Sequence, residues 1–248
     1  MPIVFRNIHK SFGPKSVLRG VDVEISDSEC FFVIGSSGTG KSVLIKHLVG
    51  LLRPDQGEIW LGGREVSRLS EIEFYEVRKQ CAMVFQNSTL FDSMTCQENV
   101  ALPLRIHRDM PMEEALKEAM RRLDQVHMTR FAKSYPAELG DGMRKRVAIA
   151  RALTLDPKYV LFDEPTTSLD PVSARRVDEM IRELCDKVGV TAIVVSHDLV
   201  SIFTIADRIA MLYKGNVRLL GTPHDFKNTD DPVVRQFIRS EAEGPMEV

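Results

Sequence analysis

One segment constrains this sequence more than any other: residues 35–42 read Gly-Ser-Ser-Gly-Thr-Gly-Lys-Ser. The segment follows the apolar run 31–34 and leads into a helical pattern over 42–48, which is the strand–loop–helix context of a phosphate-binding loop. Its three glycines let the backbone take positive φ and approach a phosphate closely, and the helix directs the positive end of its dipole at the same anion. The segment therefore predicts a nucleotide-binding protein.

The polar groups of this loop each have an expected partner on a nucleotide. Backbone N–H groups wrap around phosphate oxygens, and Lys41 reaches the β- and γ-phosphates. The Ser42 hydroxyl is an expected ligand for Mg²⁺. The predicted nucleotide-contacting residues of the loop are Gly35, Ser36, Ser37, Gly38, Thr39, Gly40, Lys41 and Ser42.

Composition narrows the class of protein further. The 248 residues carry a net charge of −2 and are 44% hydrophobic, which is normal for a globular domain and gives no basic excess for a nucleic-acid partner. The apolar runs are too short to cross a bilayer, and the first residues lack the pattern of a secretory signal. The four cysteines have no metal-ligand spacing, so we expect free thiols in a reducing cytosol.

The spacing of apolar residues predicts an α/β core with a helical insertion. Short antiparallel strands are expected before the loop, and residues 159–162 and 191–195 are typical of buried parallel strands. Residues 89–150 instead follow helical spacing. There, Asp109 is expected to cap a helix. The predicted apolar face of that helix is Met112, Leu116, Met120, Leu123 and Val126.

Two adjacent carboxylates follow the apolar run 159–162. Asp163 can hold Mg²⁺, directly or through water, and Glu164 can orient or deprotonate a water that attacks the γ-phosphate. The same sequence can also simply end a strand. Beside a phosphate-binding loop, the catalytic interpretation is favoured.

In order and spacing, these motifs resemble the nucleotide-binding subunit of an ATP-binding cassette (ABC) transporter over nearly the whole chain. The resemblance implies that Gln86 contacts Mg²⁺ and the attacking water, and that His197 contacts the γ-phosphate. It also implies that Phe12 lies against adenine and that residues 168–170 reach the partner's site across a dimer. Taken singly, such a glutamine, histidine or phenylalanine has a structural interpretation. With ATP as the nucleotide, the implied metal-contacting residues are Ser42, Gln86 and Asp163.

The resemblance implies an α/β fold of the P-loop NTPase class, with a RecA-like core, an antiparallel β subdomain and a helical insertion subdomain. Residues 1–248 are then expected to form a single ABC ATPase domain. The core with its β subdomain occupies about 1–88 and 151–225, and the helical subdomain about 89–150. A carboxyl-terminal extension covers about 226–248.

The family's signature, usually Leu-Ser-Gly-Gly-Gln, is altered here to Leu-Gly-Asp-Gly-Met at residues 139–143. Gly140 replaces the serine that would contact the partner's γ-phosphate and Asp141 replaces the first glycine, while Gly142 remains an implied nucleotide contact. Asp141 can cap its own helix, and it can also repel the phosphate by roughly 3 kcal/mol at ~5 Å and an effective dielectric near 20. A penalty of about 2–3 kcal/mol would lower the population of a closed dimer about 30- to 150-fold. The sequence therefore predicts that a homodimer closes or hydrolyses ATP poorly, unless the loop directs Asp141 away.

Finer similarity points to the ATPases of bacterial Mla-type systems, in residues 41–55, 85–93 and 205–208 and in the short carboxyl-terminal extension. These ATPases act with a membrane permease and MCE-domain proteins to move phospholipids or other hydrophobic substrates. The resemblance implies a homodimer, or an ABC heterodimer, bound to an integral-membrane permease and an MCE-domain protein. It places the chain at the cytoplasmic face of the inner membrane, with no nucleic-acid partner.

Two other functions remain open on the sequence. One is a regulatory or structural ABC subunit that binds ATP without hydrolysing it, which Asp141 favours and the intact Lys41, Glu164 and His197 disfavour. The other is an ABC protein that acts on DNA or ribosomes. Such proteins commonly carry a long coiled-coil insertion or two cassettes, and this chain has neither.

Overall fold

A six-stranded sheet forms the centre of the computed structural model, which describes residues 2–246. Its strand order is β10-β9-β3-β8-β7-β6, and all neighbours are parallel except β10, which runs antiparallel to β9. Its strands are β3 (Cys30–Ile34), β6 (Cys81–Val84), β7 (Tyr159–Asp163), β8 (Thr191–Val195), β9 (Arg208–Tyr213) and β10 (Asn216–Gly221).

A second, four-stranded sheet is antiparallel and has the order β2-β1-β4-β5. Its first two strands are longer than the short strands predicted, because the chain continues pairing through shifts of register instead of turning. Its strands are β1 (Ile3–Phe12), β2 (Lys15–Ile25), β4 (Gln56–Leu61) and β5 (Arg64–Glu65).

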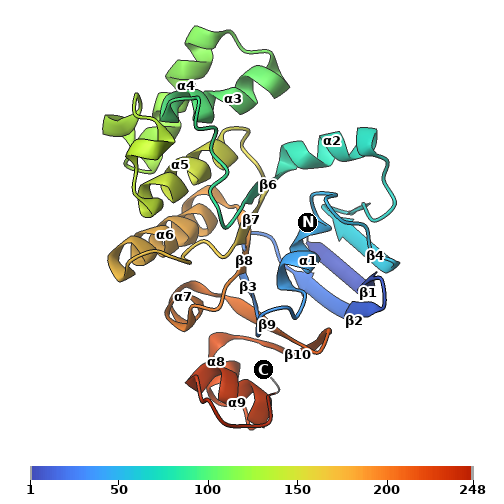
Figure 1. The fold of residues 1–248 in the computed structure, drawn as a ribbon. Coiled ribbons are helices and arrows are strands. Elements are labelled where there is room, and N and C mark those ends of the chain that lie inside the picture. Colours follow the sequence, from blue (N-terminus) through green and yellow to red (C-terminus); the bar gives the residue numbers. More distant parts are fainter. Residues whose placement is uncertain (1, 247–248) are drawn as a thin grey trace.

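Helices surround the large sheet, with α3 and α4 at one end of the molecule and α8 and α9 at the other (Figure 1). The helices are α1 (Lys41–Lys46), α2 (Glu71–Gln80), α3 (Cys96–Arg108), α4 (Met112–Gln125), α5 (Asp141–Leu153), α6 (Pro171–Glu183), α7 (Leu199–Ile205), α8 (Pro223–Lys227) and α9 (Pro232–Arg239). Short helical turns are η1 (Thr129–Phe131) and η2 (Pro136–Glu138), and η3 (Leu184–Val188) is a π-helical continuation of α6.

The strand β3 divides the interior into two hydrophobic cores. All five of its residues are buried, as expected for a parallel strand covered on both faces. Phe32, like Cys30 and Ile34, packs in the core that contains the helices α3 to α6. Phe31 and Val33 pack in the core that contains α1 and the small sheet. This alternation follows from the two-residue period of a strand, and it fixes where the loop after β3 emerges.

The helices α3, α4 and α5 pack against one another, and two predictions made for this region need correction. Asp109 does not cap the following helix; it ends α3 in the left-handed conformation at φ 47°, which aspartate tolerates better than most residues, and Pro111 precedes α4. On the predicted apolar face of α4, Leu123 and Val126 are buried but Met112 is exposed. The helix begins at Met112, where the chain has not yet reached the core.

The carboxyl-terminal part contains two short helices, α8 and α9, of which α9 lies within the predicted extension at about 226–248. Thr222 and Asp225 form a capping box at the start of α8. The last two residues of the predicted extension and the first residue of the predicted domain lie outside the described residues.

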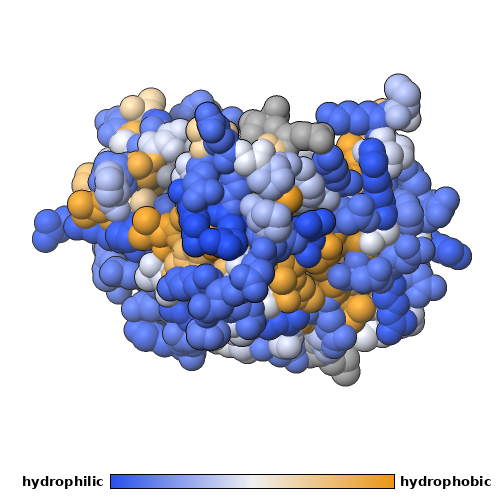
Figure 2. All heavy atoms as spheres, turned by 90° about the horizontal axis from the view of Figure 1, so that it is seen from below, coloured by the Kyte–Doolittle hydropathy of each residue, from blue (hydrophilic) through white to orange (hydrophobic). Residues whose placement is uncertain are grey.

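The surface in Figure 2 is mainly hydrophilic, with apolar side chains gathered in separate areas between charged ones. Within residues 2–246, none of the helices combines the length and the apolar character needed to cross a bilayer. The four cysteines are free and buried.

Candidate functional site

The predicted phosphate-binding loop joins the buried strand β3 to the helix α1, as its motif requires. Two of its glycines are held in positions that no other residue fits. Gly35 has φ 141°, and a Cβ atom there would lie 2.3 Å from the carbonyl oxygen of Leu212; a Cβ on Gly40 would lie 2.7 Å from Leu18. Ser37 and Gly38, at the tip of the loop, are exposed. The loop is therefore fixed at its two ends and open at its centre.

The side chain of Lys41 folds over this loop. Its Nζ donates hydrogen bonds to the carbonyl oxygens of Gly35 and Ser36, at 2.9 and 3.0 Å. Burial lowers the pKa of Lys41, and the nearby carboxylates of Glu164 and Asp163 act in the opposite direction. The ammonium group is thus placed within the loop, where phosphate oxygens would replace the carbonyl partners.

Ser42 and Asp163 come together although 121 residues separate them in the sequence. The Ser42 hydroxyl donates to Asp163 Oδ1 at 2.6 Å. A hydroxyl and a carboxylate are hard oxygen donors that suit Mg²⁺, which commonly takes one or two protein ligands beside substrate phosphates. Among residues 2–246 there is no group of three or more His, Cys, Asp or Glu side chains arranged to hold a metal ion. The two donors therefore fit a Mg²⁺ ion that is also held by nucleotide phosphates.

Glu164 and His197 form the second polar pair of the site. His197 Nδ1 lies 2.8 Å from Glu164 Oε2, and Thr167 Oγ1 donates to the same oxygen at 3.2 Å. Glu164 has φ 52°, a conformation that costs energy in a residue other than glycine, and its N–H donates to the carbonyl of Val195 at 2.9 Å. Strain of this kind is found where the surrounding structure holds a side chain in one direction, here towards His197.

The structure places Gln86 just after β6, the neighbour of β7, and exposes its side chain. A polar cavity of about 380 Å³ brings Gln86 together with Asp141, Arg144 and Ser168. The carbonyl oxygen of Gln86 accepts a hydrogen bond from Lys145 of α5, and Asp141 and Arg144 of the same helix line the cavity beside it. Neither Ser42 nor Asp163 lines this cavity. The predicted contact of Gln86 with Mg²⁺ stays a prediction.

Lys145 is a residue of this region that the sequence analysis missed. It is buried on α5, and its Nζ donates to the carbonyl oxygen of Phe85 at 3.2 Å and also to that of Gln86. Burial lowers the pKa of Lys145 to about 8, against the attraction of Asp163, Asp141 and Glu164. The residue lies in the charged run 144–146, Arg-Lys-Arg, and charged residues in a helix are usually exposed to solvent. The signal that could have found it is its position four residues before the buried Ile149.

Phe12 ends β1 with 46% of its surface exposed, so its ring is free to receive an apolar face of a ligand. Lys10 Nζ lies 5.6 Å from the centre of the ring. The hairpin that carries Phe12 is close to the phosphate-binding loop, because Val17 and Leu18 of β2 contact Gly40. The predicted contact with adenine is compatible with this position and stays a prediction.

The altered signature lies at the start of α5. Gly140 is the residue before the helix, and Asp141 does not cap the helix as predicted. Asp141 occupies the first helical position, and its carboxylate pairs with Arg144 one turn later on the same helix. Gly142 lies against Ser173 at the start of α6; a Cβ there would be 3.0 Å from that side chain. The charge of Asp141 is therefore partly neutralised within its own chain.

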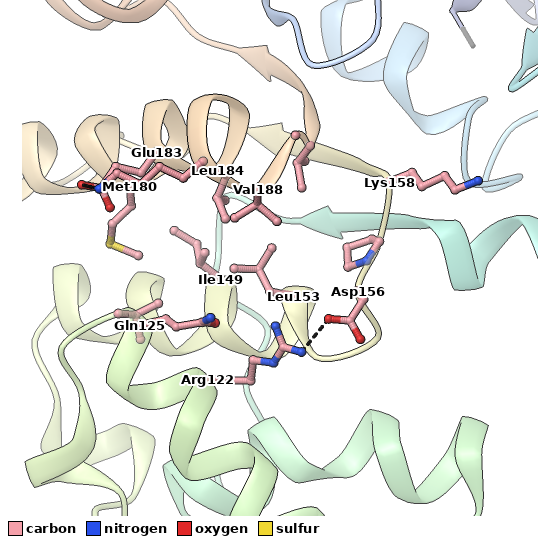
Figure 3. Close-up of a pocket in the computed structure, with 15 residues that line it drawn as sticks. Arg122, Gln125, Ile149, Leu153, Asp156, Lys158, Met180, Glu183, Leu184 and Val188 are labelled. Carbon is pink, nitrogen blue, oxygen red and sulfur yellow. Dashed lines mark hydrogen bonds and ion pairs between the residues drawn. The ribbon is translucent and has the colours of Figure 1, made fainter.

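A separate cavity of about 500 Å³ lies between the carboxyl-terminal ends of α5 and α6, and none of the predicted nucleotide-contacting residues lines it (Figure 3). Arg122 and Asp156 form an ion pair at its edge. The apolar part of its wall includes Ile149, Leu153, Met180, Leu184 and Val188. Because the predicted nucleotide-contacting residues do not line this cavity, the candidate site remains at the phosphate-binding loop.

The fold and the site define an ATP-binding cassette, and comparison with known proteins agrees. The sequence profile of the ABC transporter family matches residues 18–167. The chain belongs to the ABC transporter family. It is the ATP-binding subunit of an ABC transporter and an ATPase.

Three relatives illustrate how far the likeness extends. The intermembrane phospholipid transport system ATP-binding protein MlaF of Haemophilus influenzae is 35% identical, over 98% of this chain and 92% of that protein. The probable ribonucleotide transport ATP-binding protein mkl of Mycobacterium leprae is 36% identical, over 98% of this chain and 70% of that protein. The methionine import ATP-binding protein MetN of Carboxydothermus hydrogenoformans is 38% identical, over 96% of this chain and 72% of that protein.

Solved structures confirm the fold class. The dimeric bacterial ABC transporter cassette MJ0796 superposes with a TM-score of 0.82 and 31% identity, covering 89% of this chain and 98% of that one. A dimeric post-hydrolysis state of the same cassette, bound to ADP and phosphate, superposes with a TM-score of 0.82 and 30% identity. The α/β architecture with one mainly parallel and one antiparallel sheet is that of an ABC ATPase.

Proposed function

We propose that two copies of this chain, or this chain and a related one, sandwich ATP and drive a separate membrane permease by closing and reopening. The observation that supports this most directly is the convergence of Lys41, Ser42, Asp163 and Glu164 at one edge of the parallel sheet, with Ser42 and Asp163 2.6 Å apart. In this proposal the chain sits at the cytoplasmic face of the inner membrane through its permease. It has no nucleic-acid partner.

The residues of the site divide the work of hydrolysis. The loop 35–42 binds the phosphates, and Ser42 and Asp163 hold Mg²⁺, which would neutralise charge on the β- and γ-phosphates. Glu164 accepts a proton from the attacking water, and His197, 2.8 Å from it, orients Glu164 and contacts the γ-phosphate. Gln86 senses the permease, and Phe12 stacks on adenine.

We propose a division of the chain that matches these roles. The core with its β subdomain, about 1–88 and 151–225, binds the nucleotide. The helical subdomain, about 89–150, presents Gly142 and the rest of the signature to the partner, and a carboxyl-terminal extension covers about 226–248. Together they form a single ABC ATPase domain.

Replacing Glu164 by Gln tests the central assignment. We expect ATP binding to persist while the rate of phosphate release falls about 10²- to 10⁴-fold, because a general base is lost with little change in shape. Glu183→Gln is the matched control, since Glu183 is exposed on α6 and pairs with Lys187, away from the candidate site. A Glu164→Gln protein that releases phosphate at the unaltered rate contradicts the assignment.

The altered signature supports a second candidate function, an ABC subunit that binds ATP but hydrolyses it poorly. Gly140 lacks the hydroxyl of the usual serine, and Asp141 adds a carboxylate, even though Arg144 pairs with it. In that case the unaltered chain, studied with its permease, should bind ATP tightly and release phosphate no faster than Glu164→Gln. A clear difference between the two proteins excludes this candidate.

For the cargo, we propose phospholipid or another hydrophobic substrate, with an MCE-domain protein as a further partner. The support is the likeness to MlaF, which spans 92% of that protein, whereas mkl and MetN are named for ribonucleotide and methionine transport. The permease complex captured from membranes with this chain should show ATPase activity that changes with phospholipid. A response to methionine or to ribonucleotides instead would assign the other cargo.

A further inference from the structure

A polar cluster between α6 and α7 has no role in the function proposed above. It consists of Arg175 and Asp178 on α6, and of Asp198 and Ser201 at the start of α7. Asp178 and Ser201 are 2% and 1% exposed, so this α6–α7 cluster is buried at its centre. Charged groups are rarely buried so completely without a partner, which makes the contacts within the cluster informative.

One arginine joins the two carboxylates of the α6–α7 cluster. Arg175 Nη1 lies 2.6 Å from Asp178 Oδ2, and Arg175 Nη2 donates to Asp198 Oδ2 at 2.7 Å. The hydroxyl oxygen of Ser201 lies 3.0 Å from Asp178 Oδ2 and 2.9 Å from Asp198 Oδ2. The helix α6 is thereby linked to the start of α7 through one planar guanidinium group, which forms an ion pair with Asp178 and a hydrogen bond with Asp198.

The α6–α7 cluster is directly connected to the candidate site. Asp198 follows His197, and its second oxygen accepts from the N–H groups of Val200 and Ser201 at 2.9 and 3.3 Å, which caps α7. Both oxygens of Asp198 are thus occupied, and the backbone of His197 is fixed on that side. On its other side, the ring of His197 meets Glu164 at 2.8 Å.

We propose that Arg175, Asp178 and Ser201 are positioning residues for ATP hydrolysis, because they hold Asp198 and, through it, the ring of His197 against Glu164. The inference rests on the proposed function in one respect, the contact of His197 with the γ-phosphate. The helix that carries Arg175 and Asp178 begins directly after residues 168–170, so the cluster also ties that segment to His197.

Stability alone does not account for this arrangement. Burial raises the pKa of Asp178 to about 6, since the hydrogen bond from Ser201 and the charge of Arg175 offset desolvation only in part. The other charges that act on Asp178 are Asp198 at the start of α7 and Glu179 on α6, and both favour its neutral form. Ionised Asp178 therefore costs folding free energy at neutral pH, while it gives Arg175 a second fixed partner.

The test is Asp178→Asn in the full chain, which removes the charge and keeps the shape. Four quantities are measured: kcat for ATP, KM for ATP, the unfolding temperature, and the ring signals of His197 in protein labelled with ¹³C-histidine. His197→Ala identifies those signals among the six histidines. Glu183→Gln is the matched control, because it removes a negative charge from an exposed position on the same helix, where the carboxylate pairs with Lys187.

We expect Asp178→Asn to lower kcat about tenfold with KM nearly unchanged, at an unfolding temperature equal to or above that of the unaltered chain. The His197 signals should shift or broaden, and Glu183→Gln should leave all four quantities unchanged. Towards pH 5 the two proteins should converge in kcat, because Asp178 then takes up a proton. A residue with only a structural role would lower the unfolding temperature together with kcat and would not produce this convergence.

Unchanged His197 signals in Asp178→Asn overturn the inference, whatever the rate of hydrolysis. That readout needs no catalytic activity, so failure of the inference is distinguishable from failure of the proposed function. If Glu164→Gln hydrolyses ATP normally, the proposed function fails while the NMR result for His197 still decides whether the α6–α7 cluster positions the ring.

Discussion

The helices α1 and α5 begin alike and differ in what surrounds their first turn. Each starts at a glycine, Gly40 or Gly140, and neither start is capped by a side chain, whereas Asp170 caps α6. The first turn of α1 has no acidic residue, while that of α5 contains Asp141. Helix starts without a cap of their own leave N–H groups for another acceptor.

This difference separates a complete site from an incomplete one. At α1, the ammonium of Lys41 donates to the carbonyl of Gly35 and the hydroxyl of Ser42 donates to Asp163, all within one chain. At α5, the comparable position holds a carboxylate, and the nearest compensating charge is Arg144. We therefore expect binding of ATP to depend on α1, and closure around ATP to depend on the charge balance at α5.

The largest effect is expected at α1, from Lys41→Ala. Loss of the ammonium group should weaken binding of Mg·ATP about 100-fold or more, since a charge-assisted contact to two phosphates disappears from a partly dry site. Calorimetry measures this directly. Lys46→Ala, which changes a lysine at the other end of the same helix, is the control and should bind ATP normally. Equal uptake by the two variants would remove the basis of the proposed site.

A smaller effect of opposite sign is expected at α5. Gly140→Ser combined with Asp141→Gly should raise the rate of hydrolysis about tenfold, because the carboxylate that opposes the γ-phosphate is gone and Arg144 had neutralised only part of it. Arg144→Ala alone should lower the rate, because it leaves Asp141 without its ion pair. An unchanged rate in this double variant would show that Asp141 has no influence on closure. The charge at the start of α5 would then not distinguish it from α1.

The sequence predicts more about the site at α1 than about the start of α5. The site at α1 was predictable because its motif is contiguous. The pairing of Ser42 with Asp163 follows from placing both at the carboxyl-terminal edge of the parallel strands, Ser42 after β3 and Asp163 at the end of β7, with β8 between these strands. At α5 the sequence identified the unusual Asp141 but not its partner. Helix capping and an ion pair with Arg144 are both possible for an aspartate at a helix start, and the position of a helix boundary is set by packing, not by composition.

The same limit explains the residues that were missed. Lys145 and Asp178 are charged residues in helices, and most such residues are solvated. Only the way α5 packs beside β6, and α6 beside α7, buries them, and these contacts join segments far apart in the sequence. The misplaced cap at Asp109 has a local cause, since an aspartate suits both the start of a helix and a left-handed ending.

Phe12 is the predicted adenine contact, on the hairpin that lies close to the start of α1. Phe12→Ala should weaken binding of ATP about fivefold, because stacking of a base on an aromatic ring is lost, and Phe12→Tyr should retain it. Since the ring is 46% exposed, neither change should lower the unfolding temperature. Binding titrations with ATP measure the effect. Undiminished binding by Phe12→Ala would mean that adenine lies elsewhere.

The last expected effect is at α6, whose start is capped by Asp170, and it depends on pH. The native state binds a proton at Asp178 more tightly than the unfolded chain does, because its pKa rises from 3.8 to about 6. Compared with Asp178→Asn, the unaltered chain should therefore lose stability as pH rises from about 4 to 6 and change little above that range, by up to about 3 kcal/mol. Thermal unfolding of both proteins across this range measures the difference, expected as a few degrees. A constant difference would show that Asp178 titrates normally.

Because all four cysteines are buried, a dye can be attached to a new thiol near α5 to follow the approach of two molecules. A thiol introduced at exposed Glu138, just before α5, would be the one that a maleimide dye reaches in the folded protein. Donor- and acceptor-labelled copies mixed with ATP would then report, by energy transfer, how closely two molecules approach and how long they remain together.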